Sequence, residues 1–210
     1  MKKMVLVGGG GHCKSVLDAA LSMDEFDEIV ITDASIAVGT KIMGCKVVGS
    51  DDVLPQLRNQ GFEYAFVSVG SIKTTQVRHL IVQRLLGMGF LFPVILDPSA
   101  IVSRYANIDE GTFIGKRAVI NAGVSVGKHC IVNTGAILEH DCFVGDYSHV
   151  SVGAILCGGC LVEHDCFIGA GSTVIQEVNI GANVVVGAGA MVNRDLSNMS
   201  LAVGVPAKSV

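Results

Sequence analysis

Aliphatic side chains recur at every sixth position along the second half of the chain. The series runs without a break through Val102, Ile108, Ile114, Ile120, Val126, Val132, Leu138, Val144, Val150, Leu156, Val162, Ile168, Val174, Ile180, Val186 and Val192. A period of six with one large apolar position is typical of a short strand followed by a turn, repeated many times. Because three such units complete a triangular coil, the series predicts a stack of about five coils.

A second position of each hexad, four residues after the aliphatic one, is mostly small. Its small members include Ala106, Thr112, Ala118, Cys130, Ala136, Cys142, Ser148, Ala154, Cys160, Cys166, Ser172 and Ala190. Small residues fit tight corners, and the glycines that often follow the aliphatic residue supply permissive backbone angles. The pattern predicts a parallel β-helix, although periodicity alone does not give its hand.

Residues 1–97 alternate between short apolar strands and amphipathic helices. The pattern predicts strands at 4–7, 29–32, 64–69 and 91–95, and helices at 16–21, 54–60 and 77–86. Strands separated by helices are typical of a parallel sheet with helical crossovers. We therefore expect a Rossmann-like α/β domain at 1–97, followed by a β-helix domain with a C-terminal tail at 98–210.

Composition narrows the class of protein. Apolar residues make up 50% of the 210 residues and charged residues 16%, which is too apolar for intrinsic disorder. A net charge of −4 argues against nucleic acid as a partner, since that would need a basic face. The apolar runs are too short for a membrane span or a signal peptide. We expect a cytoplasmic protein with no membrane insertion and with reduced thiols.

The seven cysteines fit the repeat better than a metal or redox site. Four of them, Cys130, Cys142, Cys160 and Cys166, occupy the small position. Cys157 and Cys160 form a Cys-x-x-Cys motif, but the sequence holds no second such motif to complete a zinc site. Cys13 and Cys45 are expected to pack in the core of the first domain. We therefore expect structural cysteines and no metal.

His140 stands out among the six histidines because of its neighbours. It lies two places after an inward aliphatic residue, so its side chain projects from a coil. Asp141 is adjacent, and a carboxylate beside an imidazole fixes the tautomer and raises the basicity. One coil further on, Gly158 and Gly159 leave room above the imidazole and expose N–H groups that can stabilise an oxyanion. These residues predict a general base at His140, and a solvated surface histidine is the alternative.

A glycine-rich loop follows the first predicted strand. It has glycine at the first two positions of G-x-G-x-x-G but Cys13 at the third, which is a weak dinucleotide fingerprint. Such a loop before a helix N-terminus can still cradle a nucleotide diphosphate, at the sheet edge where ligands bind. The expected nucleotide-sugar site consists of Gly8, Gly10, Gly11, His12, Asp33, Gly70 and Ser71. A bare structural loop and an NAD site are the alternatives.

Several stretches resemble the bacterial sugar-acetyltransferase family called PglD/NeuD-like. They are Glu139-His140-Asp141, residues 148–154, the opening glycines with His12, and residues 204–208. The likeness covers essentially the whole chain. It implies a left-handed β-helix, a homotrimer with active sites between neighbouring β-helices, and acetyl-CoA as co-substrate. The best-matched branch N-acetylates the 4-amino group of a UDP-linked deoxy-amino-sugar. The alternative is O-acetylation of sialic acid or another sugar, as in a sister branch.

The resemblance also implies roles for individual residues. His140 matches the catalytic base and Asp141 its acidic partner, where the family often has the longer Glu. Gly158 matches a backbone donor that faces the thioester carbonyl. Asn133 and His149 match polar residues that line the acetyl-donor and sugar site. The pantetheine arm would be bordered by Ala170, Gly187 and Ala188. Lys208 would reach a CoA phosphate, and a side chain that is only solvated is the alternative.

A thioester is already activated, so acetyl transfer needs neither a metal nor a covalent intermediate. We expect direct transfer in a ternary complex, with an acyl-enzyme on Cys157 as the alternative. A metal-dependent hydrolyase on the same helix needs a histidine pair five apart, and the gaps in the repeat are 11, 9 and 15. An ice-binding scaffold needs regular threonine columns, and the helix has only three threonines.

Overall fold

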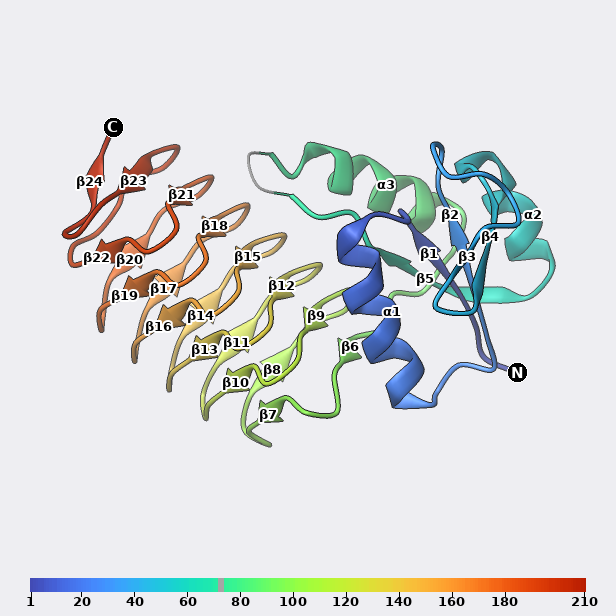
Figure 1. The fold of residues 1–210 in the computed structure, drawn as a ribbon. Helices are drawn as coiled ribbons and strands as arrows, with labels where there is room; N and C mark the ends of the chain where they lie inside the picture. Colours follow the sequence, from blue (N-terminus) through green and yellow to red (C-terminus); the bar gives the residue numbers. More distant parts are fainter. Residues whose placement is uncertain (72–73) are drawn as a thin grey trace. The chain divides into compact units, whose positions relative to one another are not determined.

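The computed structural model describes residues 1–71 and 74–210. The chain forms two compact units (Figure 1). One comprises Met1–Ser71 and Gln76–Pro98, and the other comprises Thr74, Thr75 and Ser99–Val210. The first is an α/β domain and the second a left-handed parallel β-helix, which is the predicted fold class. None of the helices in the described residues is long and apolar enough to cross a bilayer.

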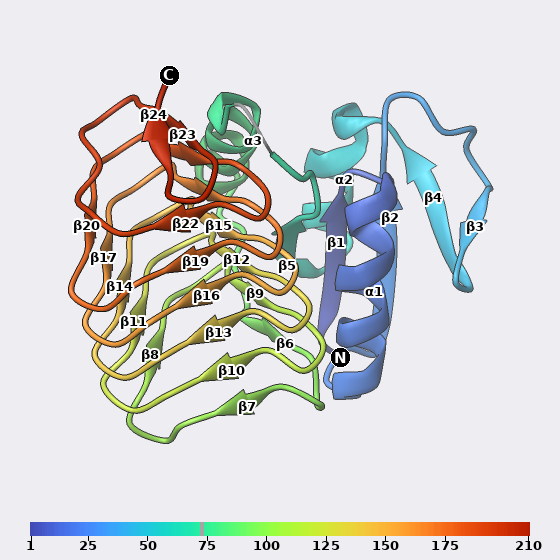
Figure 2. The ribbon, with the colours of Figure 1, turned by 60° about the vertical axis from the view of Figure 1, so that its left-hand side comes forward.

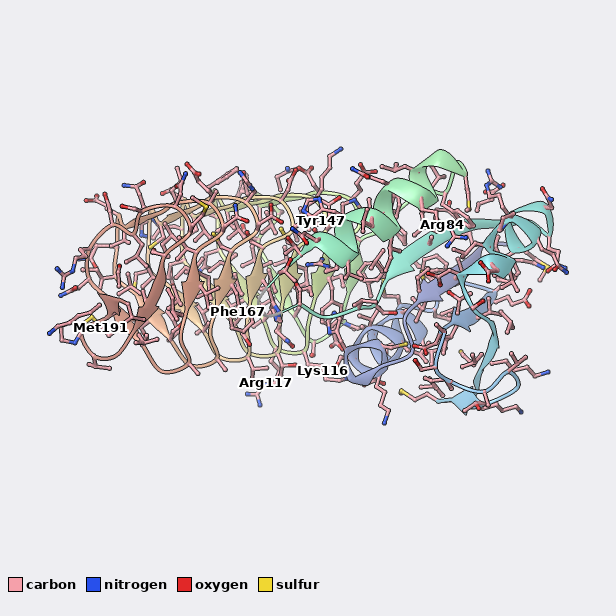
Figure 3. All side chains as sticks on the ribbon, turned by 90° about the horizontal axis from the view of Figure 1, so that it is seen from above. Arg84, Lys116, Arg117, Tyr147, Phe167 and Met191 are labelled. Carbon is pink, nitrogen blue, oxygen red and sulfur yellow. The ribbon has the colours of Figure 1, made fainter. Side chains whose placement is uncertain are left out.

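A five-stranded sheet, in the order β3-β4-β2-β1-β5, forms the centre of the first unit. Its parallel strands are β1 (Lys3–Val7), β2 (Glu28–Thr32), β4 (Cys45–Gly49) and β5 (Phe62–Val67), and β3 (Lys41–Ile42) pairs antiparallel with β4. The helices are α1 (Gly11–Met23), α2 (Leu54–Asn59), which a 3-10 turn at Asp51–Val53 precedes, and α3 (Gln76–Gly87). Helix α1 covers one face of the sheet, and α2 and α3 lie on the other (Figures 1 and 3).

Two features of this unit differ from the sequence prediction. The strand predicted at 91–95 is wrong: Leu91 forms only an isolated bridge to Tyr64, and strand β6 is Ile95–Leu96. Pro93 interrupts the predicted strand because it has no N–H to give to a ladder. The β3–β4 hairpin was not predicted, because its short strands carry lysine and too little apolar alternation.

Sixteen two-residue strands, β7 to β22, build the β-helix, and every third strand belongs to the same sheet (Figure 2). The first face consists of β7 (Ile101–Val102), β10 (Val119–Ile120), β13 (Ile137–Leu138), β16 (Ile155–Leu156), β19 (Thr173–Val174) and β22 (Met191–Val192). The second face consists of β8 (Asn107–Ile108), β11 (Ser125–Val126), β14 (Phe143–Val144), β17 (Leu161–Val162) and β20 (Asn179–Ile180). The third face consists of β9 (Phe113–Ile114), β12 (Ile131–Val132), β15 (His149–Val150), β18 (Phe167–Ile168), β21 (Val185–Val186) and β23 (Leu201–Val203), with β24 (Lys208–Ser209) antiparallel to β23.

The predicted hexad series forms the core of the helix. Residues 18 apart are in register, as Leu138 with Leu156, so the aliphatic side chains stack in columns. From Ile114 onward every member of the series is at most 1% exposed. Only Val102 and Ile108, in the first coil, are half-buried. The four cysteines of the small position are buried as predicted, and so is Cys13, whereas Cys45 is only half-buried.

Each coil turns three corners, which we name after one of their residues. The His140 corner joins the first face to the second, the His164 corner joins the second to the third, and the Asn133 corner joins the third to the first. The chain takes left-handed backbone angles at each corner, as at Asp141 (φ 60°) and Gly159 (φ 70°). Inward positions therefore build the core, and corner positions are free to carry function.

Candidate active site

His140 and Asp141 form a hydrogen-bonded pair at the His140 corner. Nδ1 of His140 lies 2.9 Å from Oδ2 of Asp141, so this aspartate reaches the ring despite being shorter than glutamate. Because the carboxylate accepts, the proton sits on Nδ1 and the lone pair of Nε2 faces away from Asp141. This hydrogen bond, and then the charges of Asp141 and Glu139, raise the pKa of His140 above its ordinary value. Both side chains are largely exposed, so the imidazole is open to a ligand.

A glycine lies beside each member of the pair. A Cβ built on Gly158, one coil beyond His140, would fall 2.5 Å from both Cε1 and Nε2 of the imidazole. A Cβ on Gly123, one coil before Asp141, would fall 2.3 Å from Oδ1 of Asp141. Real side chains do not approach so closely. The two glycines therefore leave the space that the pair occupies.

The N–H of Gly158 makes no hydrogen bond of the β-helix ladder in the part of the chain that the structure describes. The N–H groups of its two neighbours do form such hydrogen bonds. The Cys157 N–H donates to the carbonyl of Val174, and the Gly159 N–H donates to the carbonyl of His140 at 2.9 Å. At the equivalent corner position of Thr134, the side chain of Asn133 accepts the outward N–H at 2.8 Å. Within the described residues, no acceptor takes the N–H of Gly158. This N–H is thus a donor available to a ligand beside the imidazole.

An open hollow joins these groups. Its lining consists of His140, Asp141, Cys157, Gly158, Gly159, Gln176 and Glu177. Gln176 and Glu177 were not predicted, although they lie a second step of 18 residues beyond His140 and Asp141. The repeat places them there, because one further step of 18 residues leads from Gly158 and Gly159 to Gln176 and Glu177.

The chain carries the Glu-His-Asp-Cys-Phe motif twice, at 139–143 and at 163–167. Nδ1 of His164 lies 2.8 Å from Oδ2 of Asp165, so the second pair has the same hydrogen bond as the first. A separation of 24 residues is not a whole number of coils, so the second pair lies at another corner. There Ala182 and Tyr147 stand where the first pair has Gly158 and Gly123, and the Asp165 side chain is only 14% exposed. Asp165 also accepts a hydrogen bond from the hydroxyl of Thr75. In the second pair Asp165 is therefore packed, although His164 is still exposed.

Five other predicted residues gather at or beside the Asn133 corner. Nδ2 of Asn133 lies 3.3 Å from Nε2 of His149, whose ring meets the edge of Phe167 with centroids 5.1 Å apart (Phe167 is labelled in Figure 3). His149 is 8% exposed. Ala170 lies two coils further along this corner, and Gly187 and Ala188 lie three coils further. None of these five lines the hollow at His140.

Lys208 lies elsewhere, on the terminal strand β24. It lines a separate hollow together with Arg194 and Asp195. The predicted acetyl-donor residues of one chain are therefore distributed over several places, and a single β-helix does not bring them together.

Asp33 holds the glycine-rich loop in place. Oδ2 accepts the N–H of Gly9 at 2.7 Å, and Oδ1 accepts the N–H groups of Ser35 and Ile36 at 2.8 and 3.1 Å. These backbone hydrogen bonds, that of Gly9 first, lower the pKa of Asp33. Gly8 is required by its φ of 103° and by Val69, whose Cγ2 would lie 2.6 Å from a Cβ. Asp33 thus braces the loop at the carboxyl ends of β1 and β2.

The next two glycines face open space. A Cβ on Gly10 or Gly11 would meet nothing within 4 Å. Helix α1 starts at Gly11 with neither a side-chain cap nor an acidic residue in its first turn. Gly70, which precedes Ser71, lies beside His12, with 3.7 Å from its built Cβ to the His12 Cβ. The structure therefore brings the predicted loop residues together around an uncapped helix N-terminus, which favours an anion.

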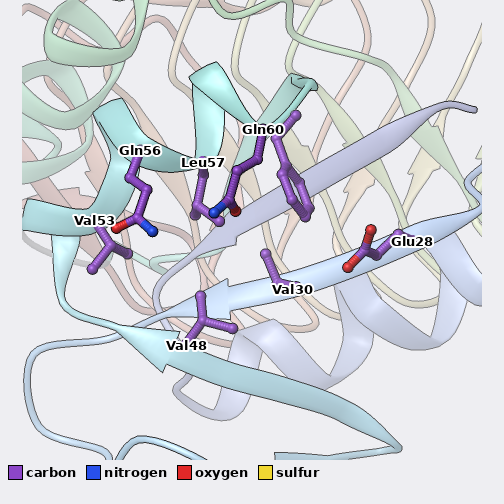
Figure 4. A pocket seen from close by; sticks show the side chains of 8 residues that line it. Glu28, Val30, Val48, Val53, Gln56, Leu57 and Gln60 are labelled. Atoms are coloured by element: carbon purple, nitrogen blue, oxygen red, sulfur yellow. The ribbon is translucent and has the colours of Figure 1, made fainter.

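A hollow of the α/β unit lies between α2 and the sheet (Figure 4). Its lining includes Val30, Val48, Gln56 and Gln60. At its rim, Glu28 pairs with Lys3 at 2.9 Å. It contains none of the predicted site residues and lies on the sheet face under α2, rather than at the glycine-rich loop.

Comparison with known proteins agrees with both units. The family model of the PglD N-terminal domain matches residues 3–85, and that of the hexapeptide repeat of succinyl-transferase matches residues 105–139 and 162–194. A GDP-perosamine N-acetyltransferase from Caulobacter crescentus is 36% identical, with 100% of this chain and 97% of that chain covered and a TM-score of 0.91. The chain belongs to the PglD-like family of sugar N-acetyltransferases.

A second solved structure is equally similar in fold. The acetyltransferase domain of PglB from Neisseria gonorrhoeae, solved with acetyl coenzyme A, is 31% identical, with coverage of 100% of this chain and 99% of that chain and a TM-score of 0.91. The Caulobacter structure holds CoA and GDP-perosamine in a variant with one histidine replaced by alanine. The predicted family and the predicted enzyme class, an acyltransferase, are both confirmed.

Proposed function

We propose that this enzyme transfers the acetyl group of acetyl-CoA to the 4-amino group of a nucleotide-linked deoxy-amino-sugar, with His140 as general base. The observation that carries the proposal is the hollow in which the imidazole of His140 lies against Gly158. Support also comes from the Caulobacter relative, whose structure contains CoA and GDP-perosamine.

The chemistry follows from the geometry. A neutral amine attacks the thioester carbonyl, and Nε2 of His140 takes the proton that the nitrogen loses. The N–H of Gly158 donates to the oxyanion of the tetrahedral intermediate. The C–S bond then breaks, and the proton passes to the CoA thiolate, leaving an amide and free CoA. Asp141 keeps the imidazole in the required tautomer and stabilises the imidazolium.

The glycine-rich loop is proposed to hold the nucleotide diphosphate of the acceptor. The open space at Gly10 and Gly11 and the uncapped start of α1 support an anion there. Asp33 contributes by bracing the loop, and His12, Gly70 and Ser71 complete the surface. We propose UDP as the nucleotide. A GDP-linked sugar is the direct competitor, because the Caulobacter relative is solved with one.

The distribution of donor-site residues supports a homotrimer. His140 and Gly158 lie at one corner of the coil, whereas Asn133, Ala170 and Ala188 lie at another. They act on one acetyl-CoA when the Asn133 corner of one copy faces the His140 corner of the next, with Lys208 near a CoA phosphate. Apolar side chains also line the outside of the first face between these corners, namely Ile101, Val119, Ile137, Ile155 and Met191. A cytoplasmic location, where acetyl-CoA is made, completes the proposal.

The experiment is an assay of free CoA thiol with acetyl-CoA and a panel of acceptors. The panel holds UDP- and GDP-linked 4-amino-sugars, CMP-sialic acid and free sialic acid. Thiol release with an amino-sugar nucleotide supports the proposal, and its rate with the two nucleotides decides between them. Release only with sialic acids would overturn N-acetylation in favour of O-acetylation.

A further inference from the structure

Gln176 and Glu177 form the far wall of the hollow that contains His140. The Gly159 N–H donates to the His140 carbonyl at 2.9 Å, and the Glu177 N–H donates to the Gly158 carbonyl at 3.0 Å. These bonds place the pair two coils beyond the His140–Asp141 layer, with only glycine between them. Since stacked strands lie about 4.8 Å apart, the backbones of the two layers are about 10 Å apart. The slot is the space between these layers, of which the imidazole and the stem of Glu177 fill a part.

Glycine also keeps the approach to the wall clear. A Cβ built on Gly159 would lie 3.5 Å from Cγ of Glu177, so the stem of Glu177 lies directly over the glycine layer. Both Gln176 and Glu177 are exposed. An amide and a carboxylate are the side chains that exchange hydrogen bonds with sugar hydroxyls and amines. The wall therefore presents sugar-binding groups to the imidazole across the slot.

The charge of the slot selects the kind of acceptor. Asp141 and Glu177 both line it, and Glu139 is close enough to raise the pKa of His140. Among the described residues that line the hollow, none is lysine or arginine. Such a slot attracts an amino group and repels an acceptor that brings a carboxylate to the reacting centre.

We propose that Glu177 and Gln176 bind the amino-sugar ring of the acceptor, with the Glu177 carboxylate accepting a hydrogen bond from the reacting nitrogen. This inference rests on the proposed function and adds the residues that orient the amine. Glu177 holds one N–H, so the nitrogen lone pair points at the carbonyl beside Gly158. His140 accepts the proton released on attack. Gln176 binds a neighbouring hydroxyl.

The test compares Glu177→Gln and Gln176→Ala with wild type on the amino-sugar nucleotide that wild type uses best. Loss of a charge-assisted hydrogen bond predicts an acceptor KM higher by about tenfold in Glu177→Gln, while the KM for acetyl-CoA stays within about twofold. Glu177→Asp, which keeps the charge, restores part of the loss. The acid limb of the pH profile stays in place, because His140 sets it.

Glu163→Gln is the matched control, since Glu163 is an exposed glutamate at the His164 corner. It is expected to leave both KM values unchanged. An unchanged acceptor KM in both Glu177→Gln and Gln176→Ala, with an active wild type, would overturn this inference and leave the proposed function intact. A wild type that acetylates no amino sugar of the panel would overturn both.

Discussion

Gly158 and His140 are complementary: the side chain that Gly158 lacks would occupy the place of the imidazole, with its Cβ 2.5 Å from Nε2. In Gly158→Ala the ring has to move, because the alanine methyl belongs to a fixed corner of the coil. The backbone of Gly158 is outside the left-handed region, so alanine itself is tolerated. We expect thermal stability near wild type and a kcat/KM lower by about 10². Gly87→Ala, where nothing lies within 4 Å, is the control. A fully active Gly158→Ala would contradict this geometry.

His140→Ala removes the proposed base. Loss of a positioned general base costs roughly 10² to 10⁴ in rate, and kcat is expected to fall within this range at unchanged stability. His164→Ala is the matched control, because His164 makes the same hydrogen bond to an aspartate at a different corner. Thiol release with acetyl-CoA measures both variants. Equal losses in the two would show that the effect is structural.

Asp141→Asn tests the origin of the pH dependence. The raised pKa of His140 means that the base is protonated, and inactive, up to a pH above the usual histidine value of 6.5. The acid limb of the kcat/KM profile of wild type is therefore expected above that pH. Asparagine removes the charge, so the limb moves to lower pH, and the rate at its plateau falls because the tautomer is no longer fixed. A limb at the same pH in both proteins would assign it to another group.

Gly11→Asp separates helix stability from nucleotide binding. An acidic residue in the first turn of α1 interacts favourably with the helix dipole, and nothing obstructs its Cβ. The same charge repels a diphosphate. We expect an unfolding temperature no lower than that of wild type and an acceptor KM raised by about tenfold or more. Gly11→Ala, which adds the methyl without the charge, is the comparison. Unchanged binding in Gly11→Asp would move the nucleotide away from this loop.

Leu156→Ala tests the core of the β-helix. Leu156 is fully buried in an inward column, so its truncation is expected to cost about 2–5 kcal/mol in the free energy of unfolding. Leu80, on helix α3, is 67% exposed. Leu80→Ala, the same change at the surface, is therefore expected to cost less than about 1 kcal/mol. Denaturant titration of both variants measures the difference.

The hexad repeat made most of the β-helix predictable, because one residue in six must be aliphatic for the columns to stack. The same arithmetic led from His140 to Gly158, and one more step of 18 leads to Gln176. The sheet domain was less predictable at its margins, where short edge strands such as Lys41–Ile42 have little hydrophobic pattern.

Two features of the site depend on three-dimensional geometry that the pattern does not contain. Asp33 was predicted to contact the ligand, and the structure shows its oxygens holding three backbone N–H groups. That role depends on the path of the turn after β2. Asn133 and His149 were predicted to line the acetyl-donor and sugar site. Within one chain they lie at a different corner from His140, because a few residues along the chain are enough to turn a corner of the coil.

Because only glycine lies in the coil next to His140, the number of coils up to the next long side chain sets the size of the substrate that the slot admits. Each coil adds about 4.8 Å, so the height of the slot is counted in coils between two residues that carry long side chains. Replacing Gln176 and Glu177 by glycine would lengthen the slot by one step, and replacing Gly158 by a larger residue would close it. Neither change touches the inward columns that hold the fold together. In this architecture a new acyl or sugar length is reached by surface substitution along one corner, without any cost to the core.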